Sequence, residues 1–162
     1  MSAAPNPIEG ITLRDYHSGD DAAMYALDLE CFEPTFRFTR RAMHRFAEQP
    51  DAIVLLAESS HLPPQLAAFV IAHMEGRTAY IVTLDVAQAF RRSGLARALM
   101  AETESRARAA GAQEIALHVF TGNSGAIAFY ESLGYSRLRM AENFYAHSVH
   151  ALVYQKQMSE RR

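Results

Sequence analysis

The stretch from Arg91 to Ala96 combines the side chains and the backbone freedom that an anion site needs. It reads Arg-Arg-Ser-Gly-Leu-Ala and lies between a strongly apolar run and a long helical pattern. The first N–H groups of a helix have no intrahelical partners, and the helix dipole adds partial positive charge at the same end. Gly94 would let a phosphate approach the backbone closely, and Arg91 and Arg92 add charge nearby. The stretch predicts a site for a phosphate-bearing cofactor, although an Arg-rich turn before a helix is more often a solvated cap.

A histidine interrupts a stretch that otherwise has the composition of a core strand. Strand alternation within 114–120 places His118 on one face with Ala116 and opposite Leu117. A histidine has an ordinary pKa of about 6.5, which suits a proton acceptor at neutral pH. Tyr80, in another apolar run, is a second polar group of this kind. Core packing is the alternative interpretation for both residues.

The composition is that of a globular protein, and it argues against several classes of function. The 162 residues predict one domain over 10–157, with flexible termini at 1–9 and 158–162. The formal net charge of −2 argues against nucleic acid as the main partner. The longest apolar run, Leu66–Ala72, is far shorter than the ~18 residues that span a bilayer. With no secretory signal at the N-terminus, we expect a cytoplasmic protein without a membrane partner.

Neither a disulfide nor a metal site is expected. Cys31 is the only cysteine, and it reads as a lone buried thiol rather than a nucleophile. His147 and His150 lack further ligands at metal spacing.

The order of expected elements, β-α-α-β-β-β-α-β-α-β-β, indicates an α/β fold with hairpins early and alternation later. The expected strands are 11–15, 52–58, 66–74, 79–86, 114–120, 135–143 and 149–155. The expected helices are 18–31, 39–49, 94–110 and 124–133. Gly111 and Gly134 follow the last two helices, where glycine commonly ends a helix.

Two motifs in this order resemble those of the GNAT N-acetyltransferases. The first is Arg-x-x-Gly-x-Ala at 91–96, and the second is Asn-x-x-Ala-x-x-Phe-Tyr-x-x-Leu-Gly at 123–134. The resemblance covers 11–156. It implies a mixed central sheet of about seven strands, splayed between strands 4 and 5 and flanked by about four helices.

The same resemblance implies acetyl-CoA as the cofactor. Its pantetheine arm would bond to backbone groups that lose their ladder partners where the sheet splays. Leu84, Asp85 and Val86 would contact the pantetheine and the thioester, with a backbone N–H there stabilising the oxyanion, and Asn123 would bond to the pantetheine arm. The pyrophosphate would bind along one stretch: Arg91, Arg92, Ser93, Gly94, Leu95, Ala96 and Arg97.

Within this family, the sequence resembles more specifically the N-terminal protein acetyltransferases of the NatE catalytic-subunit and RimI types. This resemblance rests on four stretches: 80–84, 117–119, 143–145 and 151–156. It implies direct transfer of the acetyl group to a protein N-terminal α-amino group. His118, aided by Tyr80 through ordered water, would be the general base, and Tyr130 would protonate the departing thiolate.

Five residues match regions that clamp the acceptor peptide in these enzymes: Phe32, Pro34, Val82, Phe144 and Tyr145. An aromatic slot formed by these residues would admit an extended N-terminus. The alternative interpretation is that the aromatic residues only cap the core from loops. Asp85 replaces a small residue and is expected to alter the thioester site. Other acceptors stay open, namely a small-molecule amine or a lysine side chain, as does a non-catalytic acetyl-CoA sensor. Ribosome association and homodimerisation stay open as well.

Overall fold

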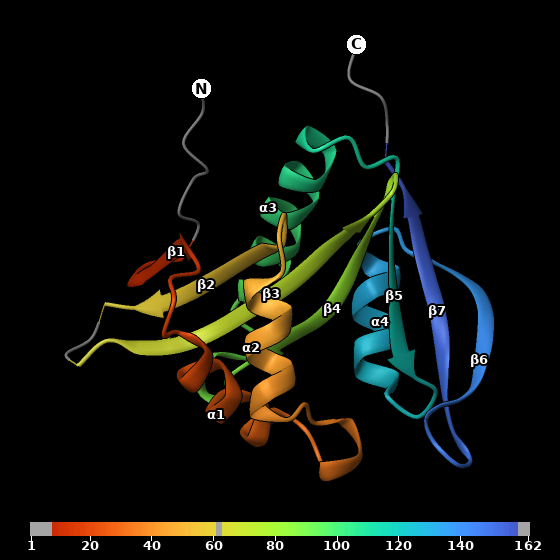
Figure 1. The fold of residues 1–162 in the computed structure, drawn as a ribbon, viewed down its shortest axis with the longest axis horizontal. Coiled ribbons are helices and arrows are strands. Elements are labelled where there is room, and N and C mark those ends of the chain that lie inside the picture. Colours follow the sequence, from red (N-terminus) through yellow and green to blue (C-terminus); the bar gives the residue numbers. More distant parts are fainter. Residues whose placement is uncertain (1–7, 61–62, 159–162) are drawn as a thin grey trace.

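In the described part of the chain, seven strands form one mixed sheet in the order β1-β2-β3-β4-β5-β7-β6 (Figure 1). The strands are β1 Ile11–Asp15, β2 Ile53–Ser59, β3 Gln65–Glu75, β4 Thr78–Val86, β5 Glu114–Phe120, β6 Ser136–Ala146 and β7 Val149–Gln157. The computed structural model describes residues 8–60 and 63–158. Most of the expected flexible termini therefore lies outside the described residues. The predicted α/β fold with a seven-stranded mixed sheet is confirmed.

Four helices connect the strands, each close to the expected range. They are α1 Asp21–Cys31, α2 Arg40–Glu48, α3 Leu95–Ala109 and α4 Ser124–Ser132. Two short 3-10 turns, η1 Pro34–Phe36 and η2 Gln88–Phe90, were not expected from the sequence. None of the described helices is long and apolar enough to cross a membrane.

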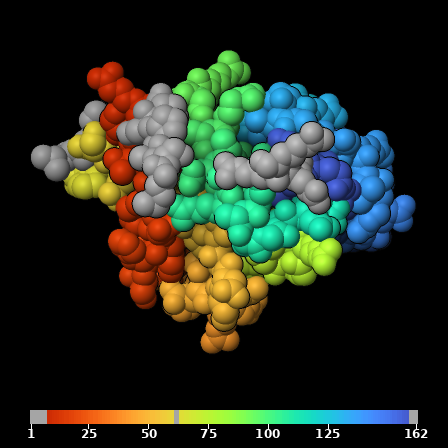
Figure 2. Space-filling view, turned by 90° about the horizontal axis from the view of Figure 1, so that it is seen from above, coloured from red at the N-terminus to blue at the C-terminus, as the bar shows by residue number. Residues whose placement is uncertain are grey.

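Helices cover both faces of the sheet, so β2 and β3 are nearly continuous apolar runs rather than alternating patterns. In β2, Val54 and Leu56 pack in a core shared with α1 and α2. The intervening Leu55 and Ala57 belong to the larger core under α3. Seen from above, the N-terminal segments lie at one end of the molecule and the β6–β7 hairpin at the other (Figure 2).

The sheet divides between its two parallel neighbours, β4 and β5. Their ladder joins only Thr78–Ile81 to Glu114–Leu117. Beyond these pairs the strands diverge, β4 remaining with β3 and β5 with β7 (Figure 1). The expected splay between strands 4 and 5 is confirmed, and it leaves main-chain groups on the facing edges without ladder partners from the opposite strand.

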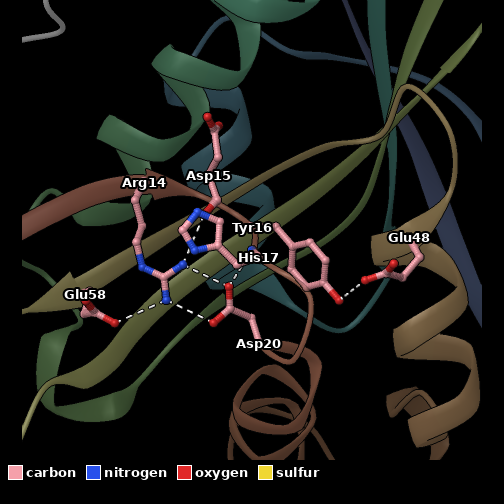
Figure 3. A network of polar contacts seen from close by, with 7 residues as sticks. All are labelled: Arg14, Asp15, Tyr16, His17, Asp20, Glu48 and Glu58. Atoms are coloured by element: carbon pink, nitrogen blue, oxygen red, sulfur yellow. Dashed lines mark hydrogen bonds and ion pairs between the residues drawn. The ribbon is translucent and has the colours of Figure 1, made fainter.

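A polar network holds α1 and α2 to the first two strands (Figure 3). Arg14 of β1 donates to Asp20, the residue before α1, at 2.9 and 3.0 Å and to Glu58 of β2 at 3.2 Å. The Tyr16 hydroxyl donates to Glu48 at the end of α2. These contacts fix the start of α1 and the end of α2.

Candidate active site

The turn before α3 presents main-chain donors on a surface groove. Arg92 has φ +61° and Gly94 has φ +84°, both in the left-handed region. The first bond of the helix joins the Ala98 N–H to the Gly94 carbonyl at 3.0 Å, so the N–H groups of 95–97 point out of the helix end. The groove is lined by Val86, Phe90, Arg91, Arg92, Gly94, Leu95, Ala96, Arg97 and Phe129. Amide donors and arginine charge on one groove fit the diphosphate of a coenzyme.

Side chains of this turn hold its shape. The Arg91 Nε–H donates to the Val86 carbonyl at 3.1 Å, and the Ser93 hydroxyl donates to the Phe90 carbonyl. Arg97 reaches across to the Ser132 hydroxyl of α4 at 3.1 Å. The turn is thereby tied both to the end of β4 and to α4.

A pocket lies where β4 and β5 diverge, and five segments of the chain contribute to it. We call it the cleft. Its lining comprises Phe32, Phe36, Phe38, Ile81, Val82, Thr83, Leu84, Leu117, His118, Val119, Phe120, Asn123, Ala126, Tyr130 and Tyr145. Aromatic rings and aliphatic side chains dominate this lining, and no Asp, Glu, Lys or Arg is among its residues.

Tyr80 and His118 meet beside the cleft. The register pairs Tyr80 with Ala116, and His118 lies two residues further along the same face of β5. The Tyr80 hydroxyl oxygen and His118 Nδ1 are 2.7 Å apart. Burial, and then the charge of Arg139, lower the pKa of His118 below its ordinary value of 6.5. Burial raises the pKa of Tyr80, so at neutral pH a neutral imidazole faces an intact phenol.

A bulge in β6 brings Phe144 onto the histidine. The β6–β7 register shifts between Ala141 and Ala146. Within this interval Asn143 adopts φ +55°, which turns the strand. Phe144 stacks flat on the His118 ring, with centroids 3.8 Å apart and planes inclined by 6°. The histidine is therefore held between a tyrosine hydroxyl and an aromatic face.

Asn123, the residue before α4, and Tyr130, in the second half of that helix, both line the cleft. The Asn123 side-chain oxygen caps the helix by accepting from the Ala126 N–H at 3.1 Å. Burial, and then the charges of Asp85 and Tyr145, raise the pKa of Tyr130. Tyr130 therefore keeps its proton at neutral pH and can donate it.

The Asp85 side chain does not line the cleft. It is not among the lining residues, although Thr83, two residues earlier on the same face of β4, is one of them. The carboxyl is 1% exposed and accepts from the Thr83 hydroxyl at 2.5 Å. The carboxyl is therefore not part of the cleft lining, and the contact of Asp85 with the pantetheine and thioester stays a prediction.

The segment 32–38 forms one wall of the cleft, which we call the acceptor wall. Three of its phenylalanines line the cleft: Phe32, Phe36 and Phe38. The Phe36 ring centroid lies 5.0 Å from that of Phe120 and 4.9 Å from that of Tyr145. Pro34 begins η1 and is not among the lining residues.

Cys31, which precedes the acceptor wall, is not activated. Burial, and then the charge of Asp85, raise the pKa of its thiol to about 11. Its sulfur contacts the Val86 carbonyl at 3.3 Å. The interpretation as an unreactive thiol agrees with this environment.

A family model for the acetyltransferase (GNAT) family matches residues 22–135, more than half of the chain. The chain belongs to the GNAT family. The resemblance drawn from the two motifs is thereby confirmed.

Relatives of this GNAT chain match it over parts of their length. An uncharacterized N-acetyltransferase YdgE of Bacillus subtilis is 38% identical over 60 residues, which are 37% of this chain and 38% of that protein. The [ribosomal protein bS18]-alanine N-acetyltransferase of Escherichia coli is 32% identical over 81 residues, 50% of this chain and 55% of the relative. The matched regions thus span about two fifths and about half of these relatives.

Solved structures share the fold across nearly the whole chain. The E. coli ribosomal-protein-S18-alanine N-acetyltransferase superimposes with a TM-score of 0.82 at 21% identity, covering 94% of this chain and 96% of that one. Arabidopsis thaliana NAA60 with a bisubstrate analogue gives a TM-score of 0.80 at 18% identity, covering 92% and 99%. These likenesses concern the fold alone.

Sequence reasoning missed part of the GNAT cleft. Phe36, Phe38 and Phe120 join it through contacts between segments remote in sequence. The density of phenylalanine in 32–38 was the one available signal. Nothing in the sequence pattern distinguished Asp28 of α1, which is fully buried.

Proposed function

We propose that this GNAT chain transfers the acetyl group of acetyl-CoA to the α-amino group of a protein or peptide. The observation that carries the proposal is the Tyr80–His118 pair, 2.7 Å apart, beside an aromatic cleft at the divergence of β4 and β5. A proton acceptor and an opening in the sheet are thus in one place.

The lining of the cleft favours an α-amino group over a polyamine or a lysine. A polycation would be attracted by carboxylates, and neither Asp nor Glu is among the residues described as lining the cleft. An α-amine has an ordinary pKa of about 8, whereas a lysine amine has one of about 10.4. A neutral histidine therefore meets a larger fraction of deprotonated α-amine at physiological pH. The alanine named as target of the E. coli relative agrees with this class of acceptor.

Each polar group of the cleft has a defined task in this proposal. With its Nδ1–H donating to the Tyr80 oxygen, His118 keeps Nε2 free to take the amine proton, directly or through water. Phe144 fixes the plane of the imidazole. Tyr130 donates its proton to the departing sulfur. Asn123 and the free edges of β4 and β5 orient the two substrates.

The cofactor would bind along the groove and the cleft. The N–H groups of 95–97 and the charge of Arg92 suit its diphosphate, and the unpaired edge of β4 near Leu84 suits its amide-containing arm. When bound, acetyl-CoA supplies the acetyl group as a thioester.

A matched set of acceptors tests the proposal. The protein is incubated with acetyl-CoA and one of four probes: a peptide beginning with Ala, its N-terminally blocked copy with a single Lys, that copy without Lys, and spermidine. Mass spectrometry reads the product and its position. We expect acetylation of the free N-terminus alone.

The other outcomes separate the rival functions. If spermidine or the lysine were acetylated in preference to the free N-terminus, the acceptor would be a small-molecule amine or a lysine side chain instead. Acetyl-CoA binding without transfer to any probe would indicate a sensor. A cytoplasmic location and association with the ribosome stay predictions from the sequence.

A further inference from the structure

Two buried carboxyl groups meet beneath the cleft, one from α1 and one from β4. Asp28 is 0% exposed and Asp85 is 1% exposed. The α1 helix packs on β4, and Asp28 acts directly on Asp85 through a hydrogen bond and through its charge. Each has one oxygen, Oδ1 of Asp28 and Oδ2 of Asp85, without a donor among the described residues.

The other oxygen of each carboxyl is bonded to a different wall of the cleft. Asp28 Oδ2 accepts from the main-chain N–H of Phe38 at 3.0 Å, at the end of the acceptor wall. Asp85 Oδ1 accepts from the Thr83 hydroxyl, within β4. The pair therefore joins the acceptor wall to the strand that borders the proposed thioester site.

Two charged carboxylates at this depth would repel and would leave both oxygens unsatisfied. A single proton between them converts the repulsion into a hydrogen bond and satisfies both oxygens. Burial, and then the hydrogen bond and charge of Asp28, raise the pKa of Asp85 well above its ordinary value.

We propose that Asp28 and Asp85 are positioning residues, which share one proton and hold the acceptor wall against β4. This inference rests on the proposed function for its effect on the acceptor. The sharing of one proton by the two carboxyls does not depend on the proposed function.

Other contacts also hold the end of α1, among them the bond from Arg37 to the Leu29 carbonyl at 3.1 Å. The Gln88 N–H donates to Glu30 at 3.0 Å, and the Cys31 sulfur contacts the Val86 carbonyl. Both lie towards the turn at 91–97, which we call the cofactor turn. The carboxyl pair alone among these contacts reaches Phe38, so its loss would release the acceptor wall more than the cofactor turn.

The groups that face the pair determine its response to pH. The positive charge of Arg91 favours the ionised form of Asp85. Cys31 of α1 and Tyr130 of α4 both face Asp85, and both stay neutral around pH 7 because burial raises their pKa. As pH rises and the shared proton leaves, the two carboxylates repel, and we expect weaker acceptor binding at alkaline pH.

Three variants separate hydrogen bonding from charge. Asp85→Asn and Asp28→Asn are nearly isosteric, and an amide can donate to the remaining carboxylate without any proton to lose. Asp85→Ala removes the bond. The acceptor KM is measured from pH 6.5 to 9.5 with the peptide beginning with Ala, or with whichever of the four probes is acetylated. At each pH the wild-type KM is divided by the variant KM, because titration of the acceptor amine affects both values equally and cancels in the ratio.

We expect Asp85→Ala to raise the acceptor KM about tenfold at neutral pH, with a smaller change in the acetyl-CoA Kd. The wild-type KM should rise at alkaline pH relative to both Asn variants, which should not show this rise. An unchanged KM in Asp85→Ala, or the same alkaline rise in the Asn variants, would overturn the positioning role.

Infrared difference spectroscopy tests the shared proton without any acceptor. At pH 8 the wild type should show the carbonyl band of a protonated carboxyl, and both Asn variants should lack it. Absence of the band from the wild type would overturn the shared proton. Presence of the band together with no acetylation of any probe would refute the proposed function instead.

Discussion

The cofactor turn and the cleft differ in how the chain builds them. The turn is one continuous stretch, 91–97, and its donors are main-chain N–H groups at a helix end. The cleft collects side chains from five segments, from Phe32 to Tyr145. A local conformation suffices for the first, whereas the second exists only when the sheet, the helices and the β6 bulge are all in place. The two halves should therefore respond to mutation in different kinetic parameters.

The largest expected effect is in the cleft. His118→Ala should lower kcat by about 10²–10⁴, because general bases contribute on that scale. The acetyl-CoA Kd should change far less, since His118 does not line the groove of the turn. Single-turnover kinetics and calorimetry measure the two quantities. Tyr80→Phe keeps the ring but loses the hydroxyl, so its kcat should fall by a smaller factor. A wild-type kcat in His118→Ala would show that His118 is not the general base.

A smaller effect is expected in the turn. Gly94→Val should raise the acetyl-CoA Kd about tenfold, because a β-branched residue is strained at φ +84° and will shift the adjacent donors. The kcat at saturating acetyl-CoA should change little. Calorimetric titration with acetyl-CoA measures the change.

Gly76→Val is the matched control for that strain. Gly76 has φ +65°, lies in the β3–β4 turn, and like Gly94 has no atom within 4 Å of an added Cβ. The Gly76→Val variant should be destabilised about as much as Gly94→Val, by about 1–3 kcal/mol, with no change in its affinity for acetyl-CoA. Equal affinities for the two variants would contradict the role of the turn.

The smallest effect concerns the pH profile of the cleft. Arg139 lowers the pKa of His118, so Arg139→Gln should raise that pKa toward 6.5. Protonated His118 cannot accept the amine proton, so the acidic limb of kcat/KM should move slightly to higher pH. The shift stays small because burial, the larger cause, remains.

Arg137→Gln removes the same charge from the same strand and is the control. No effect of Arg137 on His118 is among the causes of its lowered pKa. Its acidic limb should coincide with that of the wild type. Equal shifts in both variants would show a general effect of net charge rather than a local one.

Prediction from sequence succeeded where a pattern is local. The α3 helix was expected from 94 to 110 and runs Leu95–Ala109, since its apolar face and Gly111 define it. The helix expected over 39–49 runs Arg40–Glu48, and the Thr39 hydroxyl caps it by accepting from the Ala42 N–H at 3.1 Å. The strand expected at 135–143 instead continues to Ala146, because the bulge at Asn143 lets pairing with β7 resume at Val149.

The order of strands and helices, the two family motifs and the turn before α3 were decided by the sequence itself, because each depends on neighbouring residues. The tertiary structure alone decided which remote side chains meet. Strand register brought Tyr80 to His118, the bulge stacked Phe144 on that ring, and the packing of α1 against β4 placed Asp28 beside Asp85. Such contacts depend on the relative placement of elements, which no local pattern of residues encodes.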